Sequence, residues 1–397
     1  MKIIFLGIMF CEEALKHVYK DSLHGVSMAP HVFQTNLLSG FENLQDVDVE
    51  VINIPPTGSF PINNKKIYSK GYYWEKNNRQ IGYLNLPKIK WSIHRKKILK
   101  EIEHRLSAID DLKEVKIVAY TVYEPFLDVF IALKAKYPDV QLCLIQTDPI
   151  MGRGERDRYM TPAAIEEGNR IVAKAKVVDK FILLTKYLAD TMEVGNRPYT
   201  VVECVCNPNQ PQSKEGLHKN ICLYTGTLNE EFGIKELVDA FKLIDNAELW
   251  ICGAGNTKDY IVEQTEKHSN IKYFGYLSRE EIQQKQDECD FLINPRRPSG
   301  TYTMYSFPSK TAEYLMTGKP VIMYKLEGIP DEYDEYLNYL KASTSEDIAE
   351  ELKTIFNEKY DELISKSRNA RDFMKNNKSS IMMAQKVVTL LKNCNMN

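Results

Sequence analysis

The residues best suited to binding chemistry lie in the segment 305–330, YSFPSKTAEYLMTGKPVIMYKLEGIP. Pro308 suits the first position of a helix, where its missing N–H costs nothing. Ser309 and Lys310 then fall in the first turn, whose unpaired backbone N–H groups favour an anion. Glu313 follows four residues after Ser309 and shares its helix face. We therefore expect a site that grips a diphosphate and holds a sugar hydroxyl one turn deeper.

Glycines follow other predicted strands in the same half of the chain. Gly226 and Thr227 end the run YTGTL, and Gly253 ends LWICG. A glycine at a strand end lets the backbone approach a phosphate closely. An ordinary β-to-α turn explains these residues equally well. The G-x-G at Gly253 lacks the third glycine of the dinucleotide fingerprint, which argues against an NAD site.

Two further strand ends carry groups that recognise ligands. Gly275, Tyr276 and Leu277 follow one strand, where the backbone could read a base edge and the Tyr276 ring could stack on it. Arg296 and Arg297 close the run FLINPRR, and guanidinium groups suit bidentate contacts with phosphate. The alternative for the arginines is a solvated surface pair.

The elements that must position these residues alternate between short apolar runs and amphipathic helical stretches. This alternation predicts parallel sheets, and the polar segment 207–219 divides it into two series. We expect an α/β protein with two Rossmann-like domains facing across a cleft. The expected domains are 1–205, 206–376 and a C-terminal helix in 377–397 that packs back toward the first domain.

Composition excludes several classes of protein. The chain has 397 residues, 43% of them hydrophobic and 27% charged, and a net charge of -2, which argues against a dedicated nucleic-acid binder. No apolar run approaches the length of a transmembrane helix. The eight cysteines are scattered without zinc spacing, which favours reduced thiols in the cytoplasm and no metal site.

The order of these motifs resembles the donor-binding half of a GT-B-fold glycosyltransferase. It is most similar to family 4 of the retaining enzymes, in the bacterial group that builds surface polysaccharides. The motifs lie between about residues 221 and 333, and in the N-terminal half only the βα order supports the resemblance. They are YTGTL, LWICGAG, FGYL, INPR, YSFPSKTAEY and GKPVI.

The resemblance implies a role for each matching residue. Glu313 would accept hydrogen bonds from the donor ribose, with Ser309 and Lys310 beside the diphosphate. Gly226 and Thr227 would lie near the phosphate closer to the sugar. The full predicted donor-binding set is Gly226, Thr227, Gly253, Gly275, Tyr276, Leu277, Ser306, Phe307, Pro308, Ser309 and Glu313.

The chain departs from the family pattern where many members carry charge. Tyr305 stands in place of a first glutamate, and Thr227 and Phe232 stand in place of an arginine and a lysine. Positive charge for the leaving diphosphate must then come from elsewhere. The candidates are Arg296, Arg297 and Lys310, of which Arg296 and Lys310 are predicted as catalytic.

The N-terminal half should hold the acceptor. Asp148 is a third predicted catalytic residue, because family members often carry a His-Asp pair there, although a turn also explains it. The loop containing His24, Gly25 and Ser27 is the predicted acceptor-binding segment, and it also reads as a plain loop before a helix. The aromatic segment 67–83, predicted as a loop, would stack on acceptor sugars or cover the edge of the core.

The segment 88–105, KIKWSIHRKKILKEIEHR, is basic with interleaved apolar residues. As a helix it would lie on anionic lipid, or it would be an ordinary amphipathic surface helix.

We expect a cytoplasmic hexosyltransferase without metal or other cofactor, in contact with the inner membrane face. It would move a sugar with retention from a UDP- or GDP-sugar to a saccharide or lipid-linked saccharide, in surface polysaccharide synthesis. The alternatives are an NDP-sugar 2-epimerase and a non-catalytic sugar-nucleotide-binding partner.

Overall fold

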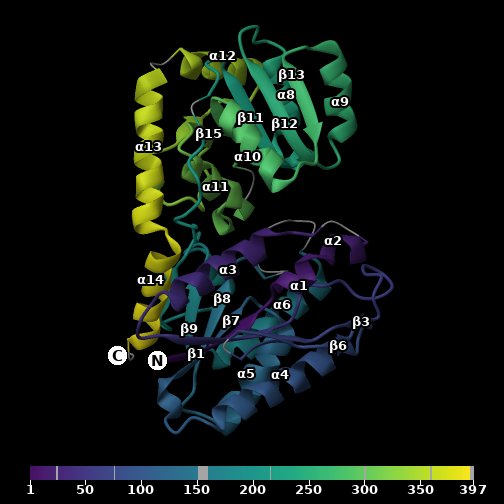
Figure 1. The fold of residues 1–397 in the computed structure, drawn as a ribbon, viewed down its shortest axis with the longest axis vertical. Helices are drawn as coiled ribbons and strands as arrows, with labels where there is room; N and C mark the ends of the chain where they lie inside the picture. Colours follow the sequence, from purple (N-terminus) through teal and green to yellow (C-terminus); the bar gives the residue numbers. More distant parts are fainter. Residues whose placement is uncertain are drawn as a thin grey trace. The chain divides into compact units, whose positions relative to one another are not determined.

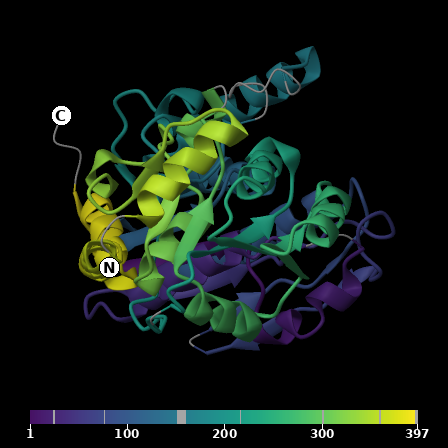
Figure 2. The same cartoon turned by 90° about the horizontal axis from the view of Figure 1, so that it is seen from above.

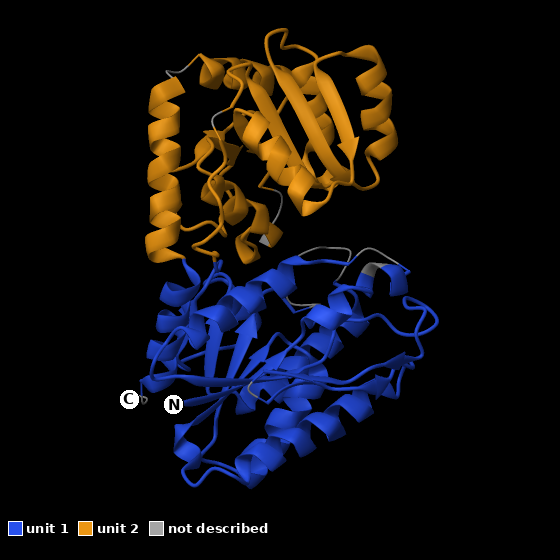
Figure 3. Ribbon diagram, viewed as in Figure 1, with its two compact units in different colours: residues 1–205, 379–397 blue, residues 206–378 orange. Residues whose placement is uncertain are grey.

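The computed structural model describes residues 1–23, 26–75, 77–150, 160–214, 216–298, 301–357 and 360–393. The chain forms two units, drawn in separate colours in Figure 3. The first unit combines residues 1–205 with 379–397, and the second comprises 206–378. The chain therefore enters the second unit after Val205 and returns to the first after Lys378.

The first unit is built on an eight-stranded sheet with the order β10-β9-β8-β7-β1-β2-β5-β4 (Figure 1). Neighbouring strands run parallel except for the antiparallel pair β4 and β5. The central strands are almost wholly buried, as expected of a parallel sheet covered on both faces. The strands are β1 Lys2–Gly7, β2 Asp48–Asn53, β4 Tyr72–Trp74, β5 Asn78–Gln80, β7 Val115–Tyr120, β8 Gln141–Gln146, β9 Lys180–Leu183 and β10 Tyr199–Val201.

The aromatic segment 67–83 is not a loop, and that prediction is wrong. Besides β4 and β5 it contains β3 (Tyr68–Ser69), which pairs antiparallel with β6 (Tyr83–Leu84). These runs of two or three residues are too short for periodicity to reveal them.

The helices of the first unit include one from the C-terminal end of the chain. Helix α14 packs on α3, and an added Cβ at Gly40 of α3 would lie 2.0 Å from the carbonyl oxygen of Ser380. Figures 1 and 2 both show the N-terminus close to α14, and Met1 packs against the same apolar core. The helices are α1 Glu12–Leu15, α2 Val18–Asp21, α3 Ala29–Glu42, α4 Lys90–Leu106, α5 Glu124–Lys136, α6 Pro162–Lys174, α7 Leu188–Thr191 and α14 Ser380–Lys392.

The second unit has a six-stranded parallel sheet with the order β13-β12-β11-β14-β15-β16. Because all its strands run in one direction, their carboxyl ends meet at one edge, where parallel sheets bind ligands. The strands are β11 Ile221–Thr227, β12 Glu248–Ala254, β13 Ile271–Gly275, β14 Phe291–Asn294, β15 Val321–Tyr324 and β16 Asn338–Leu340.

The helices of the second unit connect these strands as crossovers or follow the last one. They are α8 Ile234–Phe241, α9 Lys258–Lys267, α10 Arg279–Glu288, α11 Ser309–Thr317, α12 Ser345–Phe356 and α13 Tyr360–Asn377, with the 3-10 turns η4 Glu230–Phe232 and η5 Thr301–Tyr305 among the connections. Across the described parts of both units, no helix is long and apolar enough to cross a membrane.

Candidate functional site

The carboxyl ends of β11 and β12 approach each other at a pair of glycines. Gly226 and Gly253 are partners in the ladder, and an added Cβ at Gly253 would lie 1.8 Å from the Gly226 carbonyl oxygen. Gly253 also has a φ of 144°, which side chains rarely tolerate. The hydroxyl of Tyr224 donates to the carbonyl of Thr227 at 2.8 Å. The predicted phosphate turn is therefore held by close backbone packing and by a buried tyrosine.

The connection after β14 places a cation beside this turn. The backbone near Gly233 lies against Pro295, whose carbonyl oxygen is 2.4 Å from an ideal Cβ at that glycine. The Arg296 guanidinium lies over the ring of Phe232 at 5.3 Å and over the ring of Tyr302 at 5.2 Å. Two cation–π contacts thus orient Arg296 without neutralising it.

The neighbouring Arg297 has different surroundings. Its Nη1 lies 3.6 Å from Oε1 of Glu236 on α8. Arg297 also helps to hold down the pKa of the Tyr324 hydroxyl, which burial nevertheless raises. Arg296 has no carboxylate partner among the residues the structure describes. Of the two arginines, Arg296 is the one whose charge is available to a ligand.

Helix α11 starts one residue later than predicted. Pro308 is its N-cap, with φ −63° and ψ 119°, and Ser309 is the first helical residue. The ψ of Pro308 is extended, which excludes it from the helix although its φ would allow helix. No side chain caps this N-terminus, so its first N–H groups remain suited to an anion. In the preceding loop the buried Oγ of Ser306 has no hydrogen-bond partner in the described structure.

Two predicted ligand groups on α11 contact each other. Lys310 Nζ donates to Oε2 of Glu313 at 2.5 Å, and both side chains are partly exposed. Such exposed pairs contribute only about 0–1 kcal/mol, so a bound diphosphate and ribose could separate them at little cost.

A buried hydroxyl ties α11 to the glycine turn. The hydroxyl of Tyr314, adjacent to Glu313, accepts a hydrogen bond from the backbone N–H of Thr225 at 2.9 Å. It also lies 3.1 Å from the Thr225 Oγ1. Tyr314 is fully buried, and this burial raises the pKa of its hydroxyl, which therefore stays protonated. The helix and the end of β11 are thereby fixed relative to each other.

The remaining predicted donor residues differ in their surroundings. Gly275 has a φ of 71° with nothing near its Cβ position, and Tyr276 is 76% exposed. Leu277 is half-buried. Phe307 is buried, with its ring 5.3 Å from that of Tyr333, so its side chain serves the core and only its backbone could meet a ligand.

The predicted residues of the N-terminal half lie in the first unit. Asp148 is exposed after β8, and its Oδ2 accepts a hydrogen bond from Thr147 Oγ1 at 2.9 Å. Ser27 is exposed just before α3, whereas His24 and Gly25 lie outside the described residues. The described residues contain no group of three or more His, Cys, Asp or Glu side chains placed to hold a metal ion.

Sequence reasoning missed the residues that orient this site. Tyr302 and Tyr314 read as ordinary aromatic residues, and Phe232 was noticed only for the lysine it replaces. The available signal was the replacement of a lysine by Phe232. An aromatic ring at a position where family members carry a cation can bind a cation from another part of the chain.

Comparison with protein families identifies the second unit. Residues 207–378 match the model of the glycosyl transferases group 1 family. The match spans nearly all of the second unit and includes every predicted donor-binding residue. The second unit is therefore similar to the group 1 glycosyl transferases over residues 207–378. None of the curated proteins compared with the chain matches it in sequence.

Solved structures similar to the whole chain confirm the predicted fold class of two Rossmann-like domains, the GT-B fold. Sucrose-phosphate synthase from Thermosynechococcus elongatus has a TM-score of 0.68 at 12% identity, with 98% of both chains covered. HepE from Anabaena, in complex with UDP and glucose, has a TM-score of 0.63 at 14% identity, covering 99% of this chain and 100% of that one. A variant of TarM from S. aureus, in complex with fondaparinux, alpha-GlcNAc-glycerol and UDP, has 0.61 at 11%, with the same coverage.

Proposed function

We propose that the protein is a hexosyltransferase that moves a sugar from a UDP- or GDP-sugar to a saccharide or lipid-linked saccharide, with retention. The observation that carries the proposal is Arg296, an arginine oriented by two rings and left without a carboxylate partner among the described residues. It follows β14 in the same unit as the uncapped N-terminus of α11. A UDP-sugar donor is supported by two of the similar structures. HepE was solved with UDP and glucose, and the TarM variant was solved with UDP.

The chemistry assigned to these residues is electrostatic. As the bond to the sugar lengthens, the leaving nucleoside diphosphate gains charge. Preorganised N–H groups and an oriented guanidinium stabilise that charge without reorganisation. Lys310 would add a second cation once it leaves Glu313 for the phosphate. In the retaining reaction that the resemblance implies, the leaving phosphate accepts the proton of the acceptor hydroxyl.

Isothermal titration with UDP and with GDP tests the donor site. We expect one nucleotide to bind, and Glu313→Ala to weaken it by about tenfold through loss of the ribose contact. Lys353→Gln, a change at a partly exposed lysine of α12 that pairs with Glu350, serves as the matched control and should leave affinity unchanged. Equal affinity for the wild type and Glu313→Ala would remove the proposed ribose contact, and no binding of either nucleotide would remove the donor site.

Incubation with the matching sugar nucleotide then tests the reaction. Transfer to a saccharide acceptor is the expected outcome, with the anomeric configuration of the donor kept. An epimerised donor formed without acceptor, or donor binding without turnover, would overturn the proposal in favour of an epimerase or a non-catalytic partner.

We place the acceptor in the first unit, with Asp148 as a catalytic residue and Ser27 near the acceptor. The resemblance supports both assignments.

We also propose a role in surface polysaccharide synthesis at the cytoplasmic face of the membrane. The support is the exposed face of α4, where Trp91 and Ile89 are 44% and 45% exposed beside exposed Arg95 and Lys96. Such a face suits an anionic lipid surface.

A further inference from the structure

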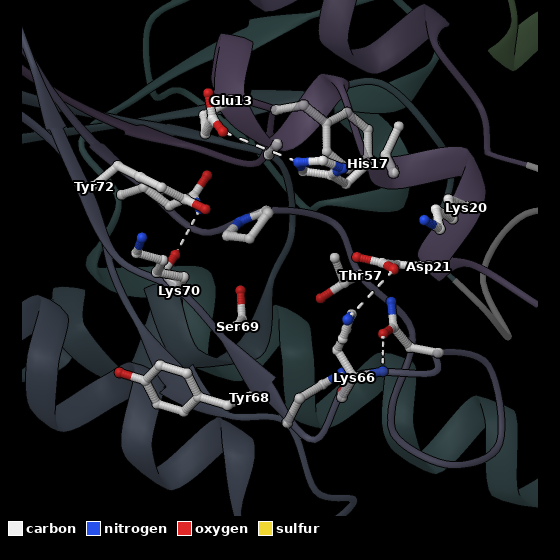
Figure 4. A pocket seen from close by; sticks show the side chains of 17 residues that line it. Glu13, His17, Lys20, Asp21, Thr57, Lys66, Tyr68, Ser69, Lys70 and Tyr72 are labelled. Carbon is white, nitrogen blue, oxygen red and sulfur yellow. Dashed lines mark hydrogen bonds and ion pairs between the residues drawn. The ribbon is translucent and has the colours of Figure 1, made fainter.

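The first unit contains a pocket of about 460 Å³ (Figure 4), which we call the N-terminal pocket. This volume is within the range of small-molecule sites, roughly 300–1,000 Å³. The residues that carry the argument come from α1 and α2, from the connection after β2, from β3 and the residue after it, and from the residue after β6. They are Glu13, Lys20, Thr57, Tyr68, Lys70 and Asn85.

The N-terminal pocket lies where a parallel sheet binds ligands. β1 ends at Gly7 and β2 ends at Asn53, and the lining residues Phe10 and Thr57 follow these two strand ends. In open α/β sheets, ligands bind beyond the carboxyl ends of the strands. The pocket therefore occupies the expected position for a substrate of this unit.

Hydrogen bonds from the sheet fix one wall of the pocket. Asn53 Nδ2 donates to Gln80 Oε1 at 3.3 Å, and Gln80 Nε2 donates to the Lys70 carbonyl at 2.9 Å. Nearby, Gly71 and Gly82 touch so closely that a Cβ on Gly82 would lie 2.7 Å from the Gly71 nitrogen. The backbone that carries Lys70 is therefore built into the sheet, and does not depend on a ligand for its position.

The charges of the pocket do not cancel. Glu13 is paired with Lys16, which lies outside the lining, at 2.8 Å. Lys16 lowers the pKa of the Glu13 carboxyl most, and Lys70 contributes only a smaller share. Asp21 faces Lys66 at 4.0 Å. Lys70 lies 5.3 Å from the centre of the Tyr72 ring (Figure 4).

Lys20 and Lys70 have no ion-pair partner within 4.0 Å among the described residues. With the two carboxylates of the lining balanced by Lys16 and Lys66, the pocket keeps a positive excess from these two lysines. A positive excess in a concave site favours an anionic ligand.

The polar and aromatic lining suits a sugar ring. Tyr68 is 54% exposed, and it lines the pocket together with Ser69 and Thr57. Asn85 is 2% exposed, and its Nδ2 donates to the Gly58 carbonyl at 2.8 Å, which fixes the orientation of the amide. Its Oδ1 accepts no hydrogen bond in the described structure. A buried, unpaired acceptor in a pocket wall calls for a donor such as a sugar hydroxyl.

We propose that the N-terminal pocket binds the acceptor of the transfer reaction and that this acceptor is an acidic saccharide. Lys20 and Lys70 would contact its carboxylate or phosphate group, the Tyr68 ring would pack on a sugar face, and Asn85 Oδ1 would accept from a hydroxyl. The identity of the ligand as acceptor rests on the proposed function. The preference of the pocket for an acidic saccharide does not.

Saturation-transfer NMR with matched disaccharides tests this preference directly. The probes are cellobiose, cellobiouronic acid and cellobiose 6′-phosphate, which share two rings and differ in the acidic group. We expect transfer to one or both acidic probes and much weaker transfer to cellobiose. A carboxylate-only or phosphate-only response identifies the acidic group. Equal responses from all three probes, or no response from the acidic ones, would overturn the proposal.

The variant Lys20→Gln/Lys70→Gln removes the positive excess. Its affinity for the acidic probe should fall about tenfold, because two charge-assisted contacts are lost at partly exposed sites. Lys176→Gln changes an exposed lysine of the same unit outside the pocket and should have no effect. A double variant that keeps its affinity would reject the lysine contacts.

Titration of UDP or GDP into the same double variant separates the two proposals. Both lysines lie in the first unit, so nucleotide affinity should match that of the wild type. If the wild type binds neither nucleotide but binds the acidic disaccharide, the proposed function fails while the pocket assignment stands.

Discussion

At the scale of single residues, Arg296 and Arg297 are adjacent in the chain but differ in their partners. We expect Arg296→Gln to lower kcat/KM for sugar transfer by about 10²–10³-fold, because an oriented cation facing the leaving diphosphate is lost. Arg297→Gln should instead lower the free energy of unfolding by about 1 kcal/mol, because Glu236 loses a partly exposed partner. Steady-state kinetics and thermal unfolding of both variants check this. Equal kinetic losses would contradict the assignment.

From the sequence, Arg296 and not Arg297 was predicted as catalytic, but the partners that distinguish the two arginines could not be identified. Their partners, Phe232, Tyr302 and Glu236, come from other elements, and local spacing does not report which ring or carboxylate folds against which guanidinium. The candidates for the missing positive charge were Arg296, Arg297 and Lys310, and they were chosen from their positions in the sequence and from the resemblance. The catalytic roles of Arg296 and Lys310 stay predictions.

His94 on α4 gives a pH dependence at the same scale. It is buried, its Nδ1 lies 2.6 Å from the Tyr123 hydroxyl, and its Nε2 has no partner among the described residues. Burial, with Lys90 and Lys97 adding to it, lowers the pKa of His94 from 6.5 to about 3. Between these values the unfolded chain binds a proton that the folded protein does not, so stability falls as pH falls below about 6.5.

The expected loss is about 2 kcal/mol between pH ~6.5 and pH ~5, at about 1.4 kcal/mol per pKa unit. Urea unfolding of the wild type and of His94→Gln over this range measures it. The variant should show a shallower pH dependence, by about one proton, whatever its absolute stability. Parallel curves would show that His94 titrates normally.

At the scale of elements, α4 has an inner face that belongs to the core and an outer face that does not. Ile98 and Ile102 are buried, whereas Trp91 and Lys96 are exposed. We expect the protein to sediment with vesicles containing anionic lipid and not with zwitterionic ones. Trp91→Ala with Lys96→Glu should reduce the bound fraction several-fold, because both an interfacial aromatic and a favourable charge are removed.

The Trp91 ring also packs edge-on against the Tyr123 ring at 6.2 Å, so the double variant should lose some stability, and vesicle binding is compared at a temperature where both proteins are folded. Binding that is equal for both vesicle types, or unaffected by the two changes, would show that α4 is an ordinary surface helix.

The elements themselves were predictable where an apolar run was long enough to stand out. Strand β1 is such a case, because Ile3 to Leu6 form an uninterrupted apolar run that is fully buried. The two- and three-residue strands β3 to β6 depend on partners elsewhere in the unit and leave no such run. One wall of the N-terminal pocket is built from them, which explains why the sequence pointed to its tyrosines and not to the pocket itself.

At the scale of the whole molecule, the two-domain α/β fold followed from the two series of strands, and solved structures confirm it. The first unit also depends on the last helix of the chain. Met383, Val387 and Leu391 of α14 join Ile3 and Phe5 in one apolar core. The core of the first unit is therefore completed by a helix that follows the second unit in the chain.

Lys180 of the first unit forms hydrogen bonds with the C-terminal end of α14. It is 1% exposed at the start of β9, and its Nζ donates to the carbonyls of Leu390, Leu391 and Asn393 at 2.7, 3.2 and 2.6 Å. These carbonyls lie at the C-terminal end of α14, where they lack partners within the helix and where the helix dipole favours a cation. The lysine therefore acts as a buried cap for a helix far away in sequence.

We expect Lys180→Met to lower the free energy of unfolding of the first unit by about 1–3 kcal/mol, because buried carbonyls lose their donor. Hydrogen exchange should show lost protection concentrated in α14, with the second unit unaffected. Lys176→Met, at an exposed site a few residues earlier, should change stability by less than about 0.5 kcal/mol. If Lys180→Met destabilises the protein but leaves hydrogen exchange in α14 unchanged, the lysine stabilises the sheet and not the helix. That result would contradict the proposal that Lys180 caps α14.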